Sequence, residues 1–321
     1  MHYCRFHTTL GCIKTTDKVR CTLINTFMFH KNFVWNMAIL EVDSNANPFD
    51  IANAKVIKVF NSRILRFSKN TIHTQADPFL FVNKEWLYLF AETQRVDRHG
   101  EIEAWRTRDL DNFEHLGVVL NLPHHVSFPS IFRSASGIHM LPETGNANEV
   151  AVYTFDDFPY RPRKEFILLK GKYFDPTIYQ RNGIWWLFVN SEKGLELFYS
   201  VSLAAKFQMH PIGVLSSNPS DYRSGGALID WNGKLYRPAQ NCTQSYGGNL
   251  GIMEIVNMSQ NSYTEVCIKS DIFDTKVDWR SSGAHHLSLA NFNGRNILAV
   301  DGRQSDYWIN RPLSFATRMI L

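Results

Sequence analysis

The chain has 321 residues, of which 44% are hydrophobic and 13% aromatic, and its formal net charge is +4. This composition is typical of a folded globular protein, and no run of about 18 apolar residues predicts a membrane span. The positive charge is thinly spread, with no basic run and no basic and aromatic stripe. The charge pattern therefore argues against nucleic acid as a partner.

Residues 1–30 carry few structural signals. Basic residues lie among Thr and Cys there, and no continuous apolar segment ahead of a small-residue cleavage site predicts a signal peptide. Five cysteines at irregular positions predict free thiols rather than a disulfide framework or a zinc site. They are Cys4, Cys12, Cys21, Cys242 and Cys267. These features predict a cytoplasmic protein.

Two strands are predicted between residues 33 and 60. Residues 33–42 form an apolar, strand-like run, and residues 54–60 alternate Val and Ile with Lys. The second pattern has the period of two that is typical of a half-buried strand. Both strands lie in an N-terminal extension, residues 1–70, which precedes a repeated region.

From residue 71 to residue 321 one pattern occurs five times: an apolar run, a turn with Gly or Asn, and a second apolar run. The first runs begin at intervals of 51, 47, 50 and 58 residues, at Asp77, Phe128, Asp175, Gly225 and Gly283. In the first four copies the second run ends 15 residues after the first begins, at Glu92, Glu143, Asn190 and Gln240. A constant offset predicts hairpins of constant register.

Self-similarity near 50 residues, built from short strands, is typical of β-propellers, which have one small antiparallel sheet per repeat. We therefore predict an all-β fold, a five-bladed β-propeller over residues 71–321, with little helix and one domain overall. The predicted third strands of the first four blades are 102–106, 150–153, 195–199 and 250–254. Residues 33–60 are the candidate clasp that completes the last blade.

The hairpin geometry places certain side chains together. The start of a first strand and the end of an antiparallel second strand lie at the same rim of the central axis. The positions expected at one mouth of the channel are Asp77, Glu92, Glu143, Asp175, Asn190, Gly225 and Gln240. Carboxylates accept hydrogen bonds from sugar hydroxyls, and the eight tryptophans offer faces for sugar rings. We therefore predict a carbohydrate or glycoconjugate ligand.

Glycoside cleavage needs a carboxylic acid that protonates the leaving oxygen and a carboxylate that acts as base or nucleophile. Asp77, Glu143 and Asp175 are the candidate catalytic residues, and Glu92 is a further carboxylate for substrate binding. Carboxylates crowded at one rim raise one another's pKa, which keeps such an acid protonated. The alternative role of an Asp-Pro pair is to cap backbone N–H groups at a strand entry. Only two of the five copies have Asp there.

Polar residues near the blade-four strands are candidates for substrate binding. Arg223, Arg237 and Gln240 belong to this group, and Asn190 adds an amide from blade three. An arginine here could hold a phosphate or a uronate, and the alternative is an ordinary surface arginine.

Two histidine pairs, His124–His125 and His285–His286, resemble metal-binding pairs. Adjacent strand residues point to opposite faces, and a zinc site needs three or four convergent ligands. We therefore take His125 and His285 as candidate substrate-binding residues. No metal or other cofactor is predicted, and a cation on the propeller axis is left open.

Seven motifs together resemble the N-terminal propeller domain of the plant glucosamine inositolphosphorylceramide transferases and its bacterial stand-alone relatives. They lie at residues 76–79, 127–130, 140–144, 175–177, 223–226, 236–240 and 283–286, so the resemblance covers roughly residues 70–305. In the plant proteins, sugar transfer is attributed to a separate C-terminal domain. The propeller domain is in turn similar to the five-bladed propellers of glycoside hydrolase family 43.

The resemblance to the hydrolase family implies an Asp base in blade one, an Asp that tunes pKa in blade three and a Glu acid at the start of blade four. Asp77 and Asp175 match the first two. Residues 223–226, Arg-Ser-Gly-Gly, occupy the third place. Because this glutamate is missing, ordinary family-43 hydrolysis would need Glu143 or Glu92, from a neighbouring blade, as the acid.

The leading hypothesis is a glycoside hydrolase-like enzyme with Asp77 as base, Glu143 as acid and Asp175 as pKa modulator. One alternative is a glycosyl or sugar-phosphate transferase of glycan biosynthesis, and another is a non-catalytic glycan-binding propeller. A protein-interaction propeller would show apolar patches on its blades rather than a polar channel mouth.

Overall fold

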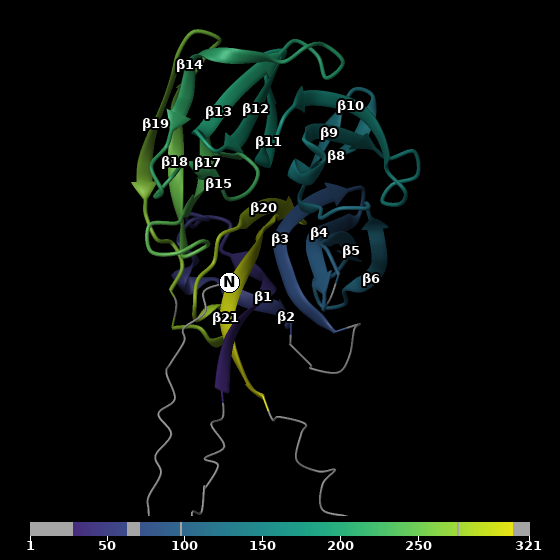
Figure 1. Cartoon of the computed structure of the whole chain (residues 1–321), viewed down its shortest axis with the longest axis vertical. Helices are drawn as coiled ribbons and strands as arrows, with labels where there is room; N and C mark the ends of the chain where they lie inside the picture. The colour runs from purple at the N-terminus through teal and green to yellow at the C-terminus, as the bar shows by residue number, and fades with distance from the viewer. Residues whose placement is uncertain (1–27, 63–70, 97, 275, 311–321) are drawn as a thin grey trace, which may run out of the picture. The chain divides into compact units, whose positions relative to one another are not determined.

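A computed structural model describes residues 28–62, 71–96, 98–274 and 276–310 (Figure 1). The chain divides into two compact units, residues 1–32 with 307–321, and residues 33–306. Everything below concerns the second unit, which includes residues 33–70 of the predicted extension. Among the described residues, the regular structure is β-strand apart from three single-turn 3-10 helices, and none of these helices is long and apolar enough to cross a membrane.

Three blades are antiparallel sheets formed by consecutive strands. Blade one contains β3 Ile72–Asn83, β4 Trp86–Arg95, β5 Glu101–Thr107 and β6 Glu114–Leu120. Blade two contains β7 Ser127–Ser134, β8 Gly137–Glu143, β9 Glu149–Thr154 and β10 Arg163–Lys170, with the 3-10 turn η2 Gly145–Ala147. Blade three contains β11 Phe174–Arg181, β12 Ile184–Ser191, β13 Gly194–Ser200 and β14 Gln208–Ser216.

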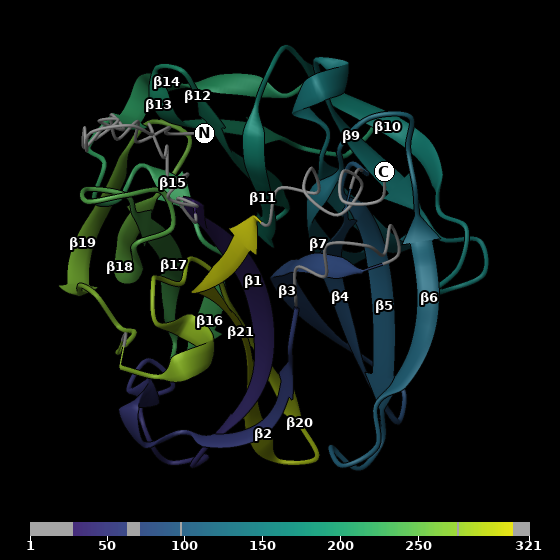
Figure 2. The same ribbon diagram turned by 60° about the horizontal axis from the view of Figure 1, so that its bottom comes forward.

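The other two blades are less regular. Blade four contains β15 Arg223–Ser224, β16 Ile229–Trp231, β17 Lys234–Asn241, β18 Asn249–Met258 and β19 Tyr263–Lys269. Blade five contains β20 Leu287–Phe292, β21 Arg295–Asn310, β1 Met28–Val42 and β2 Lys55–Phe60, with the 3-10 turns η1 Ile51–Asn53 and η3 Asp278–Arg280 before its sheet strands. Figure 2 shows the sheets arranged around a common centre.

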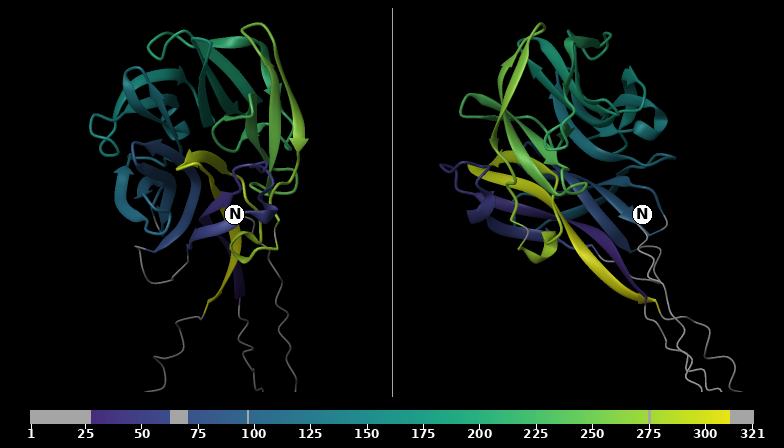
Figure 3. Two further views of the ribbon diagram at one scale, coloured as in Figure 1. Left: turned by 180° about the vertical axis from the view of Figure 1, so that it is seen from behind. Right: turned by 60° about the vertical axis from the view of Figure 1, so that its left-hand side comes forward.

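Blade five is assembled from both ends of the chain. Its strand order is β20-β21-β1, and β2 pairs with the free side of β1. Figure 3 shows β1 and β21 side by side. A parallel bridge between Trp35 and Thr74 joins blade five to blade one, so the two blades form one eight-stranded sheet. The strands from residues 33–60 therefore belong to the blade that closes the ring.

Apolar clusters fill the spaces between neighbouring blades, and β1 shows how the sequence produces them. Met37 and Ile39 pack in the cluster between blades five and one, whereas Ala38 and Leu40 pack in the cluster between blades four and five. Successive residues of a strand point to opposite faces. A strand that is buried on both faces therefore appears as the continuous apolar run seen at residues 37–40.

The hairpins of blades one to three share one register. In each, the residue that ends the predicted second run pairs with the residue before the start of the predicted first run, as in Ala76 with Glu92 and Ser127 with Glu143. The pairing then shifts, which marks a β-bulge. The bulged residues, Asp77, Phe128 and Asp175, have φ of 52°, 48° and 46°.

The predicted first strands of blades four and five are interrupted. Residues 225–228 separate β15 from β16, and the run predicted from Gly283 enters a sheet strand only at Leu287. The cause is close backbone packing between the blades. The Leu287 N–H donates to the Gly225 carbonyl at 2.9 Å, and a Cβ on Gly226 would lie 2.1 Å from the Leu287 carbonyl oxygen.

Candidate functional site

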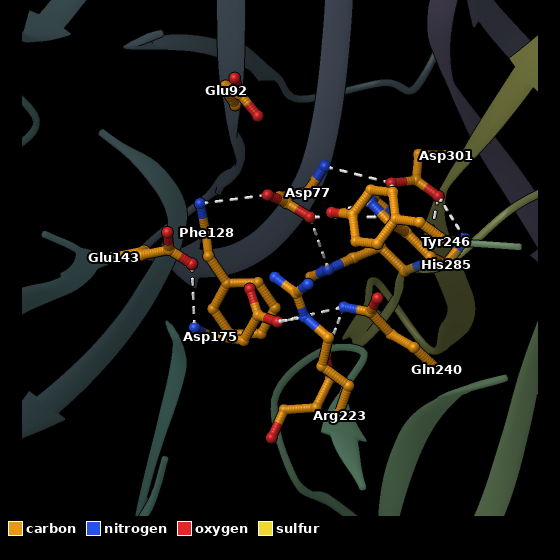
Figure 4. Close-up of polar contacts among 12 residues, drawn as sticks. Asp77, Glu92, Phe128, Glu143, Asp175, Arg223, Gln240, Tyr246, His285 and Asp301 are labelled. Carbon is orange, nitrogen blue, oxygen red and sulfur yellow. Dashed lines mark hydrogen bonds and ion pairs between the residues drawn. The ribbon is translucent and has the colours of Figure 1, made fainter. Parts of the chain in front are cut away.

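The bulges bring backbone N–H groups and carboxylates together at the centre (Figure 4). The Asp77 N–H donates to Asp301 Oδ2 at 3.3 Å, and the Phe128 N–H donates to Asp77 Oδ2 at 3.3 Å. The Asp175 N–H donates to Glu143 Oε2 at 3.0 Å. Each bulge is thus capped by a carboxylate from the preceding blade. The carboxylates have a structural role in addition to any chemical role.

Asp77 is the most central of these groups. Only 6% of its surface is exposed. Burial, together with the charges of Asp175 and Asp301, raises the pKa of its carboxyl to about 7. The nearby charge of His285 opposes this shift. A carboxyl group with a pKa near 7 can exchange a proton at neutral pH. Its left-handed backbone is a strained conformation of the kind that clusters at functional sites.

His285 and Asp301 form an ion pair beside Asp77. His285 Nδ1 lies 2.6 Å from Asp301 Oδ2 and 4.0 Å from Asp77 Oδ1. Asp301 Oδ1 also accepts the N–H groups of His285 and His286, at 2.8 and 3.0 Å. Asp301 raises the pKa of His285 against the effect of burial, and the charge of His285 lowers the pKa of Asp301 despite its burial. Each of the two groups therefore favours the charged form of the other.

On the other side of Asp77, Asp175 binds Arg223. Arg223 Nε lies 2.5 Å from Asp175 Oδ2, and Gln240 Nε2 donates to the same oxygen at 3.3 Å. Burial raises the pKa of Glu143 well above its ordinary range, and the charge of Asp175 raises it further. Burial thus favours the neutral form of Glu143, whereas Asp175 is the carboxylate that holds the arginine.

A pocket of about 550 Å³ opens beside these residues. Glu143 and Arg223 line it together with two aromatic side chains, Phe174 and Tyr222, and with Lys193. The Arg223 guanidinium lies 5.7 Å from the centre of the Phe174 ring. The pocket combines a carboxyl group, a cation and aromatic faces, a set of groups suited to a polar ring such as a sugar.

Glu92 lies near the same centre (Figure 4). Burial raises its pKa well above the ordinary value, with Asp77 and Glu143 raising it further. Its Oε1 is 3.5 Å from His125 Nε2, and His125 Nδ1 accepts the Gly100 N–H at 3.0 Å. Burial lowers the pKa of His125. His125 thus contacts the site through Glu92.

Two predicted ligand-binding residues have structural partners instead. Arg237 is fully buried within blade four, where its Nε donates to Glu265 at 2.9 Å, so the structure corrects its expected position at the channel mouth. The physical reason is that this buried cation pairs with a carboxylate on β19. Asn190 donates to the Tyr222 carbonyl and accepts the Ser224 N–H, so its amide joins blades three and four.

Asp77, His285 and Asp301 offer ligand atoms within 4.8 Å of one another. Because His285 Nδ1 is already paired with Asp301, we assign the three residues to an ion-pair network and not to a metal site. Among the cysteines, Cys242 and Cys267 are free thiols, and Cys4, Cys12 and Cys21 lie outside the described residues.

The sequence reasoning missed Asp301, Tyr246 and the bulge at Phe128. Asp301 lies next to the end of the second run of blade five, residues 298–302, much as Glu92 and Glu143 end theirs, so its position in the repeat carried a usable signal. Tyr246 lies in the loop between β17 and β18, and no repeat position marks it. Its hydroxyl lies 3.2 Å from His285 Nε2.

Residues 29–303 match the family described as "Glucosamine inositolphosphorylceramide transferase 1, N-terminal". The chain belongs to this family. It is 31% identical over 243 residues to glucosamine inositolphosphorylceramide transferase 1 of Oryza sativa subsp. japonica and 30% identical to that of Arabidopsis thaliana. Each alignment covers 71% of this chain, and the chain spans about a third of the length of these relatives. The predicted family resemblance is confirmed.

Solved glycosidase structures share the fold. A putative glycosidase from Bacteroides thetaiotaomicron has a TM-score of 0.54 at 12% identity, covering 81% of this chain and 96% of the other. A GH43 β-xylosidase/α-arabinofuranosidase from a compost metagenome has a TM-score of 0.53 at 10% identity, covering 78% and 98%. These likenesses confirm the all-β, five-bladed propeller fold.

Proposed function

We propose that this protein acts in glycan biosynthesis and catalyses glycosyl transfer to a hydroxyl of a sugar conjugate bound at the channel mouth. Asp77 takes the proton of the attacking hydroxyl as the new bond forms, and a second group donates a proton to the leaving oxygen. Glu143, which lines the pocket and whose pKa is raised by burial, is the donor predicted from the sequence. Asp175 holds Arg223 beside the pocket and adds negative charge near both acids.

One observation carries this proposal: Asp77 is a buried carboxyl group on a strained bulge with a pKa near 7. A general base works best when its pKa lies near the working pH. A carboxylate that served only as a cap would be expected to ionise fully and to have a lowered pKa. A raised pKa at a buried, strained position therefore supports a role for Asp77 beyond its bond to the Phe128 N–H.

The choice of transfer over hydrolysis rests on the family. Both reactions use the same base, and they differ in whether the attacking hydroxyl belongs to a sugar conjugate or to water. The curated relatives are named as transferases, whereas the likeness to glycosidases lies in the fold. The family names thus favour the transferase alternative over the hydrolase hypothesis. Because transfer in the plant proteins is attributed to a separate C-terminal domain, we propose that this propeller carries out a transfer step of its own, which the panel below tests.

A glycan-binding module without catalysis is the second candidate. The observation that favours it is the capping of each bulge by a carboxylate, because such capping explains these residues without a reaction. This candidate predicts that ligands stabilise the protein but are not converted.

The test compares wild type with Asp77→Asn on a panel of sugar donors and glycoconjugate acceptors, with products detected by mass spectrometry. The asparagine oxygen can still accept the Phe128 N–H, so the cap is kept while the base is lost. We expect Asp77→Asn to lose about 10²-fold or more in transfer rate. Asp111→Asn, at an exposed aspartate, is the matched control and should retain wild-type rates.

Equal rates for wild type and Asp77→Asn would refute the proposed role of Asp77. If no donor is converted but a sugar raises the melting temperature of wild type, the glycan-binding candidate holds instead. The same panel with water as the only acceptor separates hydrolysis from transfer.

A further inference from the structure

Tyr246 connects the centre of the site to the surface. Its side chain is 48% exposed, yet its hydroxyl lies 3.2 Å from Nε2 of the buried His285. The opposite ring nitrogen of His285 lies 2.6 Å from Asp301. Figure 4 shows the Tyr246 ring beside Asp77 and His285. The Tyr246 hydroxyl, the His285 imidazole and the Asp301 carboxylate thus form a chain of polar contacts.

The loop that carries Tyr246 is firmly held. Arg303 Nη1 donates to the Tyr246 carbonyl at 2.7 Å, and Arg303 Nη2 donates to Ser245 Oγ at 2.8 Å. Gly247 has φ of 61°, and a Cβ there would lie 2.6 Å from the Trp35 ring. The Tyr246 hydroxyl is therefore placed against His285 by a fixed backbone.

His285 is built to carry a positive charge. Its ring stacks on Trp35, with centroids 4.2 Å apart and planes at 21°. An aromatic face attracts a cation, and Asp301 supplies the opposite charge. The charged groups that face His285 are Asp301, Asp77 and, at longer range, Asp175, all of which favour its protonated form.

We infer that Tyr246 is the catalytic residue that protonates the leaving oxygen, with His285 supplying the replacement proton and Asp301 fixing His285. This inference rests on the proposed function and names the proton donor of that reaction. It assigns Glu143, whose carboxyl group accepts the Asp175 N–H, to positioning Asp175 and Arg223.

The proton balance of the step is closed. The bond between the sugar carbon and the leaving oxygen breaks, and its electron pair stays on that oxygen. The oxygen takes the Tyr246 proton, and Tyr246 takes the Nε2 proton of His285. The attacking hydroxyl bonds to the sugar carbon and gives its proton to Asp77. His285 has then lost its Nε2 proton and Asp77 has gained one, so the summed charge of the two residues is unchanged.

The test uses Tyr246→Phe and Glu143→Gln on two donors that carry the same sugar. One donor has an alkoxide leaving group, which needs a proton. The other is the glycosyl fluoride, whose leaving group needs little protonation. We expect Tyr246→Phe to lose about 10²-fold or more with the first donor and under about 10-fold with the fluoride. Tyr160→Phe, at an exposed tyrosine, is the matched control.

If instead Glu143→Gln loses rate with the first donor and recovers it with the fluoride, while Tyr246→Phe does not, Glu143 is the acid and the inference is overturned. Equal losses of Tyr246→Phe on both donors would also overturn it, because they would indicate a role in binding. Glu143→Gln keeps an oxygen that accepts the Asp175 N–H, so neither variant should fail to fold.

A second measurement does not depend on turnover. In wild type, NMR should place the His285 titration above its ordinary pKa of 6.5, and Asp301→Asn should lower it. Tyr246→Phe should change the Nε2 resonance of His285, and an unchanged resonance would refute the relay. If wild type converts no donor, fluorides included, the proposed function fails, and this titration still decides whether the relay exists.

Discussion

Asp77, Phe128 and Asp175 occupy the same bulge in three blades, but only the two aspartates add charge there. Blades four and five have glycines with positive φ nearby, Gly226 and Gly283. The repeat thus requires a left-handed residue, which glycine adopts most easily. Non-glycine residues at such positions cost of order 1–3 kcal/mol and persist only where surrounding structure holds them. Asp77 and Asp175 occupy left-handed positions despite that cost.

The pH dependence of transfer should be bell-shaped. Asp77 acts as a base only when ionised, so activity should rise through about pH 7. His285 supplies a proton only when protonated, so activity should fall as pH rises through its pKa, which lies above 6.5. The measurement is kcat/KM against pH, and Asp301→Asn should move the alkaline limb to lower pH. An unmoved limb would contradict the assignment to His285.

Buried His286 should make the fold sensitive to acid. Burial lowers its pKa from 6.5 to about 3, and neither ring nitrogen has a hydrogen-bond partner. In the unfolded chain the His286 ring takes up a proton below about pH 6.5, whereas in the folded chain it does so only below about pH 3. The folded state therefore loses stability as the pH falls from 6.5 to about 3. His286→Phe should reduce the fall in melting temperature between pH 6.5 and 4, whereas His99→Gln at an exposed site should not.

At the scale of single elements, the hairpins and the blade interiors are held by different forces. Three hairpins turn through Asn-Gly pairs, and both residues of each pair have positive φ, as in Asn182 with 53° and Gly183 with 76°. This geometry matches the right-handed twist of the strands. Inside blade four, by contrast, one buried ion pair joins β17 to β19.

Gly183→Ala should destabilise the protein by about 1–2 kcal/mol, because alanine resists the left-handed backbone. A Cβ at this position would meet no atom within 4 Å, so the cost would come from the backbone alone. Asn182→Gly is the control and should change stability by less than about 0.5 kcal/mol. Equilibrium denaturation measures both variants, and equal values would disprove the backbone explanation.

Glu265→Gln should destabilise the protein by about 3–5 kcal/mol, because it leaves Arg237 as a buried charge without its partner. The matched control lies in the same blade. Glu254 pairs with Lys234, whose side chain is 56% exposed, so Glu254→Gln should cost at most about 1 kcal/mol. Similar effects of the two substitutions in urea denaturation would show that burial does not set the strength of the Arg237 pair.

At the scale of the compact unit, residues 33–306, the ring is closed by β1. This strand lies between β21 and β3, and its two faces pack into the clusters on either side of blade five. Stability should therefore be shared by all blades, and the unit should unfold in one transition.

Ile39→Ala should cost about 2–5 kcal/mol, because Ile39 is fully buried between blades five and one. The unfolding curves from circular dichroism and tryptophan fluorescence should shift together. Val56→Ala on β2, where the side chain is 50% exposed, should change stability by less than about 0.5 kcal/mol. Separate transitions for the two probes would contradict unfolding of the unit as a whole.

The sequence by itself determined the repeat, the hairpin register and the blade count, because strand pairing within a hairpin depends on local spacing. It also placed Asp77, Asp175 and Glu143 at one rim. Only the tertiary structure decided which partner each charge meets. Asp301 reaches Asp77 across 224 residues, and Tyr246 meets His285 from a loop with no repeat position. Arg237 was misplaced for the same reason, since the partner of a buried charge is chosen by packing between strands and not by position along one of them.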